Sequence, residues 1–182
     1  AVSTKGVKEG DFTMIYGFPG NTQEYVTSDA VEYVAEVSDP MKIALRTKRL
    51  DIISAEQAKS AEVRIAYAAV HASIANGWKK WQGEVLGLHR LGTVAKKQAY
   101  ERDFAAWAKS KPEYASLLDS MKAAYKSVTT DYFIRELYNE SVGTVSIFNF
   151  ARSVAASVDK QEVDDDDIAT QIAMFGKTYN RT

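Results

Sequence analysis

The stretch from Ser60 to Gly92, SAEVRIAYAAVHASIANGWKKWQGEVLGLHRLG, decides the fold. Its large apolar residues recur at steps of 4, 3, 4, 4, 3, 4 and 3, and they are Val63, Tyr67, Val70, Ile74, Trp78, Trp81, Val85 and Leu88. Steps of three and four place side chains on one face of an α-helix. The stretch therefore predicts one long amphipathic helix, which Ser60 caps and which ends near Gly87 and Gly92.

Helical signals continue on both sides of this stretch. Ser28 or Asp29 can cap a short helix that reaches Val37. Asp39-Pro40 is typical of an N-cap followed by proline at the first helical position, and this helix should extend to about Lys59. The apolar spacing predicts further helices over residues 94–108, 114–128, 131–138, 144–158 and 164–179. Asp131 can cap the short helix that reaches Tyr138. Because the connections are short, we expect a mainly α, multi-helix, antiparallel bundle-like domain.

Residues 1–28 follow a different pattern. Glycines at positions 6, 10, 17 and 20 punctuate this segment, Asp11–Phe18 resembles a buried strand, and Phe18–Asn21 resembles a turn. Only one or two strands fit here, and a lone hairpin needs a sheet or helices to pack on. We therefore expect residues 1–28 to be what is left of a β-structure cut away from a helical domain over residues 29–182, which is itself expected to be incomplete.

Composition excludes several classes of function. The chain has 182 residues, 46% of them hydrophobic, which is compatible with one domain and a real core. Its 23 basic and 24 acidic residues give a net charge of -1, which argues against a nucleic acid or an anionic membrane as the main partner. The absence of cysteine excludes disulfides, thiolate metal sites and a catalytic cysteine. No run approaches the roughly 20 apolar residues of a membrane span.

Residues that could carry chemistry alone are few. His71 and His89 are the only histidines, and they lie about 27 Å apart along one helix at 1.5 Å per residue, too far to share a metal. The acidic run Asp164–Asp167 lacks the glycine and distal glutamate of a calcium loop and fits the first turn of a helix. All three tryptophans fall on apolar stripes, which favours core packing over a stacking platform. Nothing resembles the Gly-x-Ser-x-Gly nucleophile motif, and we expect no metal and no cofactor.

Asn76 lies off the apolar stripe, about 200° around the helix from Ile74. Ala72 and Ser73 leave space on its face, and Gly77 follows directly. A glycine inside a helix costs about 1 kcal/mol relative to alanine, so Gly77 indicates the close approach of another group. From these residues alone, an exposed asparagine on a solvated face is the simpler interpretation of Asn76.

A resemblance to a known family changes that interpretation. Colinear blocks over the first hundred residues are similar to the bacterial dipeptidyl-peptidase 7 and 11 family, and they are residues 10–22, 25–28, 49–53, 62–68, 74–80, 88–92 and 96–99. The most informative blocks read GDFTMIYGFPGNT, EVRIAYA, IANGWKK and LHRLG. The remaining sequence agrees in helical character but offers weaker motifs.

The resemblance implies an exported serine peptidase that removes dipeptides from peptide N-termini. It also implies a chymotrypsin-type double β-barrel with an inserted helical domain that covers the cleft. Residues 1–28 would then be the end of the first barrel, and the catalytic His, Asp and Ser would lie outside this chain. Asn76 corresponds to the family's asparagine that helps bind the substrate amino terminus, and this reverses the interpretation of Asn76 in favour of a substrate role.

The resemblance further implies peptide substrates with a free N-terminus and a periplasmic or cell-surface location in a Gram-negative bacterium. In agreement with the charge balance, we expect no nucleic acid and no membrane as partner. The resemblance leaves open whether the parent protein is a homodimer. An alternative from another class stays open as well, namely a non-enzymatic helical binding or interaction domain.

Overall fold

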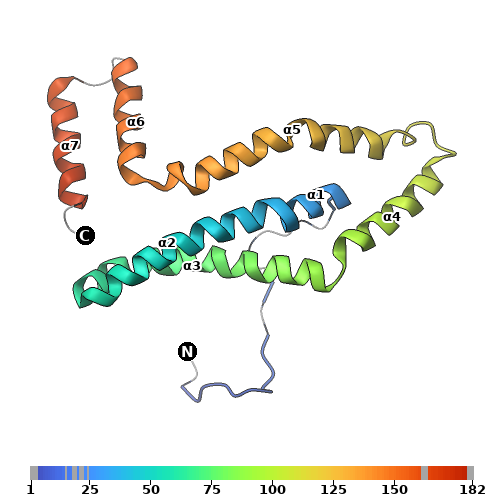
Figure 1. The fold of residues 1–182 in the computed structure, drawn as a ribbon, viewed down its shortest axis with the longest axis horizontal. Helices are drawn as coiled ribbons and strands as arrows, with labels where there is room; N and C mark the ends of the chain where they lie inside the picture. Colours follow the sequence, from blue (N-terminus) through green and yellow to red (C-terminus); the bar gives the residue numbers. More distant parts are fainter. Residues whose placement is uncertain are drawn as a thin grey trace.

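The computed structural model describes residues 4–14, 16–17, 20, 23, 25–160 and 164–179. Seven α-helices and two short segments of other helical types account for most of the described chain (Figure 1). In chain order they are α1 Ser28–Tyr33, the π-helical segment η1 Val34–Ser38, α2 Asp39–Lys59, α3 Ala61–Arg90, α4 Thr93–Ala108, α5 Leu117–Glu140, the 3-10 segment η2 Val142–Thr144, α6 Ser146–Asp159 and α7 Asp165–Tyr179. The prediction of a mainly helical domain is confirmed.

Helices α1 and α2 are one continuous helix with a π-helical turn between them. Asp39 has helical dihedrals of -69° and -41°, so the predicted N-cap at Asp39 is wrong. Its backbone N–H donates to the carbonyl of Val34, five residues back. Pro40 has no N–H to donate, and its ring would clash with the carbonyl four residues back in an α-helix. A wider π turn just before Pro40 relieves that clash, which lets the chain continue instead of starting a new helix.

Helix α3 is the long helix that the apolar steps predict. Ser60 caps it, because its side chain accepts a hydrogen bond from the backbone N–H of Val63 at 3.3 Å. The helix passes through Gly87, so the predicted end is correct only at Gly92. Gly92 adopts a left-handed φ of +59°, and its N–H bonds to the carbonyl of His89 at 3.0 Å. This is the conformation in which glycine commonly terminates a helix.

Helix α5 spans the region in which two helices were expected. Residues 117–140 form one helix, and Asp131 lies exposed in its interior, so the predicted cap at Asp131 is wrong. No glycine or proline interrupts the sequence between residues 117 and 140, so nothing breaks the helix once it has started. A cap needs a neighbouring break in the helix as well as a suitable side chain.

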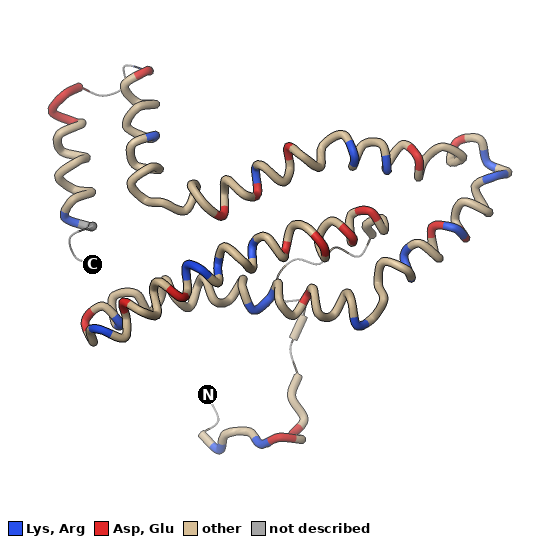
Figure 2. The backbone as a smooth tube through the Cα atoms, in the orientation of Figure 1, with Lys and Arg blue, Asp and Glu red and all other residues tan. Residues whose placement is uncertain are grey.

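The last two helices lie apart from the others. Figure 1 shows α6 and α7 as a pair that points away from α2 and α3 at one end of the molecule. Phe150 of α6 stacks on Phe175 of α7 with ring centroids 4.4 Å apart. The predicted helix start at the acidic run is confirmed, because Asp164 Oδ1 accepts a hydrogen bond from Asp167 N at 2.9 Å. The acidic residues gather at the first turn of α7 (Figure 2), where the helix dipole favours them.

The packing is more open than a bundle. Helices α2 and α3 lie side by side as an antiparallel hairpin, α4 contacts α1, and α5 lies along α2 (Figure 1). Among the described residues, the buried apolar side chains are Val31, Ala35, Leu50, Ile74 and Ala108. The predicted antiparallel bundle is therefore confirmed only for the α2–α3 pair. No helix in the described part of the chain combines the length and apolar character that a membrane span requires.

The strand predicted over Asp11–Phe18 is not confirmed. Residues 11–14, 16 and 17 form no ladder with any other described residue, while Ile15 and most of the expected turn lie outside the described residues. Phe12 and Tyr16 are 90% and 96% exposed. A strand needs a neighbouring strand for its backbone hydrogen bonds, and the described part of this chain supplies none.

Two glycine substitutions of opposite effect test the description of α3 and its end. Gly92→Ala should lower the free energy of unfolding by about 1 kcal/mol, because an L side chain is strained at a φ of +59°. Gly83→Ala should raise it by about 0.5–1 kcal/mol, because Gly83 lies inside the helix with open space around its Cα. Urea denaturation of both variants measures the difference. Equal effects of the two substitutions would contradict the described end of α3.

Candidate functional site

Asn76 lies on the open face of α3. Its side chain is exposed, as are Ala72 and Ser73 one turn before it and Lys79 and Lys80 one turn after it. The Asn76 side chain forms no hydrogen bond with any other described residue. Its carbonyl oxygen and its amide group are therefore open to solvent, and the substrate role of Asn76 stays a prediction.

Gly77 allows a side chain from α2 to reach the backbone of α3. A Cβ at position 77 would overlap Nη1 of Arg46 and lie 3.2 Å from its Cζ. Arg46 Nη1 donates to the carbonyl oxygen of Ile74 at 3.2 Å. The predicted close approach at Gly77 is thus confirmed, and the approaching group is the guanidinium of Arg46.

The guanidinium of Arg46 is held on its other sides as well. Its Nε donates to Glu140 Oε2 at 2.9 Å and its Nη2 donates to Glu140 Oε1 at 2.8 Å, a two-point ion pair with α5. Arg46 Cζ lies 4.2 Å from the centroid of the Trp81 ring, which places the cation over an aromatic face. Arg46 therefore connects three helices at one point.

A second ion pair joins α2 to α5 one helical turn earlier. Lys42 Nζ donates to Glu136 Oε1 at 2.5 Å and to Ser38 Oγ at 2.7 Å. Tyr33 Oη donates to Glu136 Oε2 at 2.7 Å, and Ser38 Oγ donates to Glu136 Oε1 at 3.0 Å. The carboxylate of Glu136 thus accepts hydrogen bonds on both oxygens.

These contacts shift the titration of Glu136 and Tyr33 in opposite directions. Burial alone would raise the pKa of Glu136, but the hydrogen bonds from Lys42, Tyr33 and Ser38 and the charge of Lys42 outweigh it, so the pKa is lowered. Burial and then the hydrogen bond to Glu136 raise the pKa of the Tyr33 phenol. At neutral pH, Glu136 is therefore ionised and Tyr33 is a neutral donor.

Asp39 is the most unusual acid of the described chain. Its side chain is buried, with a relative exposure of 3%. Its Oδ2 has no hydrogen-bond partner among the described residues. Burial, followed by the charge of Glu84 and a hydrogen bond with Glu84, raises the pKa of Asp39 to about 7. A hydrogen bond between two carboxyl groups needs one proton, and the raised pKa of Asp39 places that proton on Asp39. Glu84 also forms an ion pair with Lys80.

These polar residues line a hollow of about 440 Å³ between α1, α2, α3 and α5. Asp39, Lys42, Lys80, Glu84 and Glu136 face it. Each of these side chains already contacts another of the set, so the hollow is an internal polar network rather than an empty catalytic centre. The described residues contain no group of three or more His, Asp or Glu side chains arranged to hold a metal ion.

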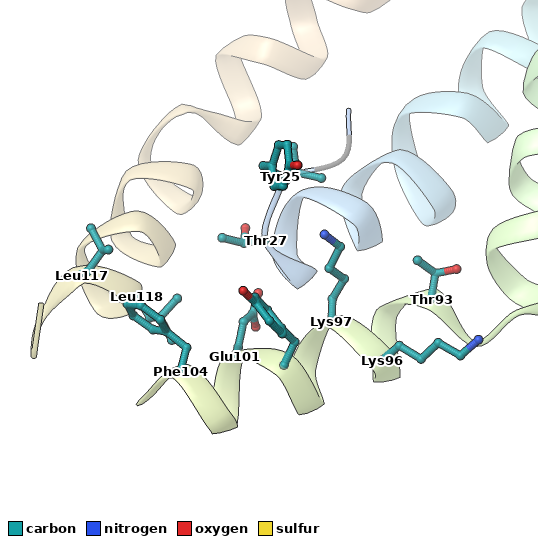
Figure 3. Close-up of a pocket in the computed structure, with 11 residues that line it drawn as sticks. Tyr25, Thr27, Thr93, Lys96, Lys97, Glu101, Phe104, Leu117 and Leu118 are labelled. Atoms are coloured by element: carbon teal, nitrogen blue, oxygen red, sulfur yellow. The ribbon is translucent and has the colours of Figure 1, made fainter. Parts of the chain in front are cut away.

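A larger hollow of about 690 Å³ lies between the start of α1, α4 and the start of α5 (Figure 3). Tyr25, Phe104, Leu117 and Leu118 contribute much of its apolar wall. Glu101 is engaged within this wall, because its two carboxylate oxygens accept hydrogen bonds from Ser28 N at 2.5 Å and Ser28 Oγ at 2.6 Å. Glu101 thereby satisfies a free N–H at the start of α1 and fixes α4 against it.

The other sequence-based candidates have separate surroundings. His71 Nε2 lies 3.3 Å from Ser54 Oγ, and His89 Nε2 lies 3.5 Å from Glu36 Oε1, so the two histidines are not part of one site. Core packing is only partly correct for the tryptophans. Trp78 is half-buried and donates to Thr47 Oγ1 at 2.8 Å, whereas Trp107 is 51% exposed.

Sequence reasoning missed the residues of the polar network. Asp39 was interpreted as an N-cap, and Arg46 and Glu140 were given no role. A signal was present in the charge spacing, because Lys42 and Arg46 are four residues apart, as are Glu136 and Glu140. Matching steps of four on two helices are compatible with two ion pairs one turn apart.

Comparison with known proteins identifies relatives of this chain. The profile of the family described as Peptidase S46 matches residues 1–176. An Asp/Glu-specific dipeptidyl-peptidase from Capnocytophaga gingivalis is 41% identical over 130 residues, which cover 70% of this chain and 18% of that protein. One of the same name from Flavobacterium psychrophilum is 38% identical over 144 residues, or 78% and 20% of the two chains. Dipeptidyl-peptidase 7 from Porphyromonas endodontalis is 36% identical over 157 residues, or 84% and 19%. The chain spans about a fifth of the length of these curated relatives.

The raised pKa of Asp39 predicts a specific dependence of stability on pH. The folded chain holds this proton up to about pH 7, whereas an unperturbed aspartate has a pKa of 3.8. The contribution of Asp39 to the free energy of unfolding is therefore complete below pH 3.8 and is lost as the pH rises through 7. Asp39→Asn keeps a donor toward Glu84 but does not titrate. Between about pH 5 and pH 8 its free energy of unfolding should therefore fall by roughly 2 kcal/mol less than that of the wild type.

Urea denaturation of the wild type and Asp39→Asn at the two pH values measures this difference. The exposed Asp103 on α4 supplies the matched control, and Asp103→Asn should leave the pH dependence as it is in the wild type. If the free energy of unfolding of Asp39→Asn fell between the two pH values by as much as that of the wild type, Asp39 would not be the group that holds the proton.

Proposed function

The chain belongs to the peptidase S46 family, and on this basis we propose that it is the helical lid of a longer serine dipeptidyl peptidase. In this proposal the parent enzyme removes dipeptides from peptide N-termini. Asn76 accepts a hydrogen bond from the terminal ammonium of the substrate. The catalytic His, Asp and Ser belong to β-barrels outside this chain, and residues 1–28 lead from the first of them.

The names and lengths of the relatives support a role as part of a larger enzyme. All three relatives described above are named as dipeptidyl-peptidases, and each is about five times as long as the segment that matches. Two of them are named as Asp/Glu-specific and one is not. The proposal therefore covers the removal of dipeptides and assigns no preferred residue at the scissile position.

The exposed apolar surface supports packing against further protein. Several large apolar side chains are more than half exposed, and they include Val7, Phe12, Met14, Tyr16, Tyr25, Ile65, Leu86 and Tyr100. Many of them belong to the N-terminal segment, which extends away from the helices in Figure 1. Exposure of so many large apolar side chains favours packing against other protein. We assign this surface to the barrels of the parent enzyme.

The position and chemistry of Asn76 carry the substrate role. A peptidase that releases dipeptides has to bind the terminal ammonium in order to fix the distance to the scissile bond. An ammonium has three donors, and an asparagine carbonyl supplies an acceptor without adding charge. Asn76 is exposed on α3 and makes no hydrogen bond to another described residue, so its carbonyl is available. Further acceptors would come from the barrels.

The location in the proposal is the periplasm or the cell surface of a Gram-negative bacterium, where peptides from digested protein are available. The alternative, a non-enzymatic helical interaction domain, shares the helical fold but gives Asn76 no substrate to bind. The two functions therefore differ in what a substitution at Asn76 does.

Asn76→Ala in the full-length protein should lower kcat/KM on dipeptidyl substrates about 10- to 100-fold. The reason is the loss of a hydrogen bond to a charged group, which contributes about 1.5–3 kcal/mol, and about 1.4 kcal/mol corresponds to a factor of ten. Steady-state kinetics on a chromogenic dipeptidyl substrate measures the loss, and thermal unfolding should change little because the side chain is exposed.

Gln82→Ala is the matched control, because Gln82 is also an exposed amide on α3. It should leave kcat/KM within about twofold of the wild type, since surface substitutions are usually near neutral. An Asn76→Ala enzyme with wild-type kinetics would exclude Asn76 from the substrate site.

The 182-residue chain expressed alone should not hydrolyse dipeptidyl substrates, because none of the catalytic groups lies within it. The assay compares this chain with the full-length protein at equal concentration. Robust turnover by the isolated chain that survives purification controls would refute the assignment of the catalytic residues to other parts of the parent.

A further inference from the structure

We propose that Arg46 is a positioning residue for Asn76, because its guanidinium holds the turn of α3 that bears Asn76 against α2 and α5. This inference rests on the proposed function, since it takes Asn76 as the acceptor for the substrate ammonium. It adds a residue on a different helix, 30 positions away in the sequence, to the determinants of amine recognition.

Arg46 has one orientation available because each side of its guanidinium has a partner. Glu140 takes Nε and Nη2 in a two-point ion pair at 2.9 and 2.8 Å. The ring of Trp81 lies 4.2 Å from Cζ. The side chains of Arg46 and Glu140 are only 18% and 14% exposed. A planar fork with two fixed bonds leaves Nη1 pointing in a single direction.

That direction is toward the backbone of α3. Nη1 donates to the carbonyl of Ile74 at 3.2 Å, two residues before Asn76. A helical carbonyl already accepts a bond from the N–H four residues on, so Arg46 supplies a second donor from outside the helix. The backbone that carries Asn76 is thereby tied to a charged group of α2 and, through Glu140, to α5.

Gly77 makes this contact possible. A Cβ at position 77 would overlap Nη1, and the nearest atoms to it all belong to Arg46. An alanine at this position would therefore displace the guanidinium rather than α3, whose helical conformation alanine favours. Gly77 and Arg46 therefore act together, because the glycine next to Asn76 makes room for the guanidinium that holds this turn of α3 in place.

The contact of Arg46 with α3 matters because the Asn76 side chain has no hydrogen-bond partner of its own among the described residues. Its amide can meet a substrate ammonium only where the backbone of α3 places it. A displacement of about 1 Å at a substrate-positioning group can cost about 100-fold in rate. Releasing Arg46 frees this turn of α3 from α5, and the acceptor then loses its fixed position.

A double-mutant cycle in the full-length protein tests the inference. The variants are Arg46→Ala, Gly77→Ala and Asn76→Ala, with the two double variants Arg46→Ala/Asn76→Ala and Gly77→Ala/Asn76→Ala. Arg46→Ala and Gly77→Ala should each lower kcat/KM by about tenfold or more on a free-amine dipeptidyl substrate. In the Asn76→Ala background the same changes should cost less than about twofold, because the group that they position is already absent.

Two further measurements separate positioning from general stability. On a substrate analogue that lacks the α-amino group, Arg46→Ala and Gly77→Ala should match the wild type within about twofold. Gly83→Ala, which adds a methyl group to open space on the same helix, should leave kcat/KM unchanged. Gly77→Ala keeps the test decisive if Arg46→Ala does not fold, because Gly77→Ala leaves the ion-pairing groups of Arg46 and Glu140 in the chain.

The outcomes distinguish this inference from the proposed function. Equal losses in the wild-type and Asn76→Ala backgrounds, or equal losses with and without the substrate amine, would overturn the positioning role while leaving Asn76 in the site. Normal kinetics of Asn76→Ala would overturn the proposed function, and the inference would fail with it. The positioning role is supported if Arg46→Ala and Gly77→Ala lower kcat/KM only on the free-amine substrate and only in proteins that retain Asn76.

Discussion

Two ion pairs one helical turn apart, Lys42–Glu136 and Arg46–Glu140, determine where α5 lies. Helix α5 has no buried residue of its own, so apolar packing alone does not hold it. The four charged side chains are between 13% and 18% exposed. At this degree of burial, removing one partner leaves a charge without compensation, which is strongly unfavourable. A shift of α5 by one turn would do the same, because one carboxylate would lose its cation. The pairs therefore specify the register of α5 on α2, whatever they add to stability.

The same contacts extend to α3, which carries the candidate site. The ring of Trp81 lies under both cations, 5.3 Å from Lys42 Nζ and 4.2 Å from Arg46 Cζ. Arg46 also reaches the carbonyl of Ile74. One face of α3 is thus fixed by charged groups of α2, while the opposite face remains open and bears Asn76. A helix held on one side and open on the other is suited to present a rigid side chain to a ligand.

The predictability of this structure from sequence depends on how local each signal is. The apolar stripe of α3, the Ser60 cap and the acidic start of α7 depend on residues within one or two turns, and they were predicted correctly. Asp39-Pro40 has the local pattern of a helix start, but its environment is set by Glu84, 45 residues away. The candidate site divides in the same way. Gly77 indicated a close approach by its position alone, whereas Arg46 and Glu140 are 94 residues apart and their pairing depends on the fold.

The substrate role of Asn76 could be predicted only through resemblance, because its position on the helix is equally compatible with an exposed asparagine on a solvated face. Its surroundings also show why it cannot bind an ammonium alone. Lys79 and Lys80 follow at the three- and four-residue spacings that place side chains near Asn76 on the helix surface. Lys80 is paired with Glu84, but Lys79 is exposed and would repel a second cation. A neutral amide beside these lysines gives direction to a hydrogen bond but no net attraction for an ammonium. Asn76 therefore contributes direction to the proposed recognition of the substrate amine, and the attraction for its charge has to come from other groups of the proposed enzyme.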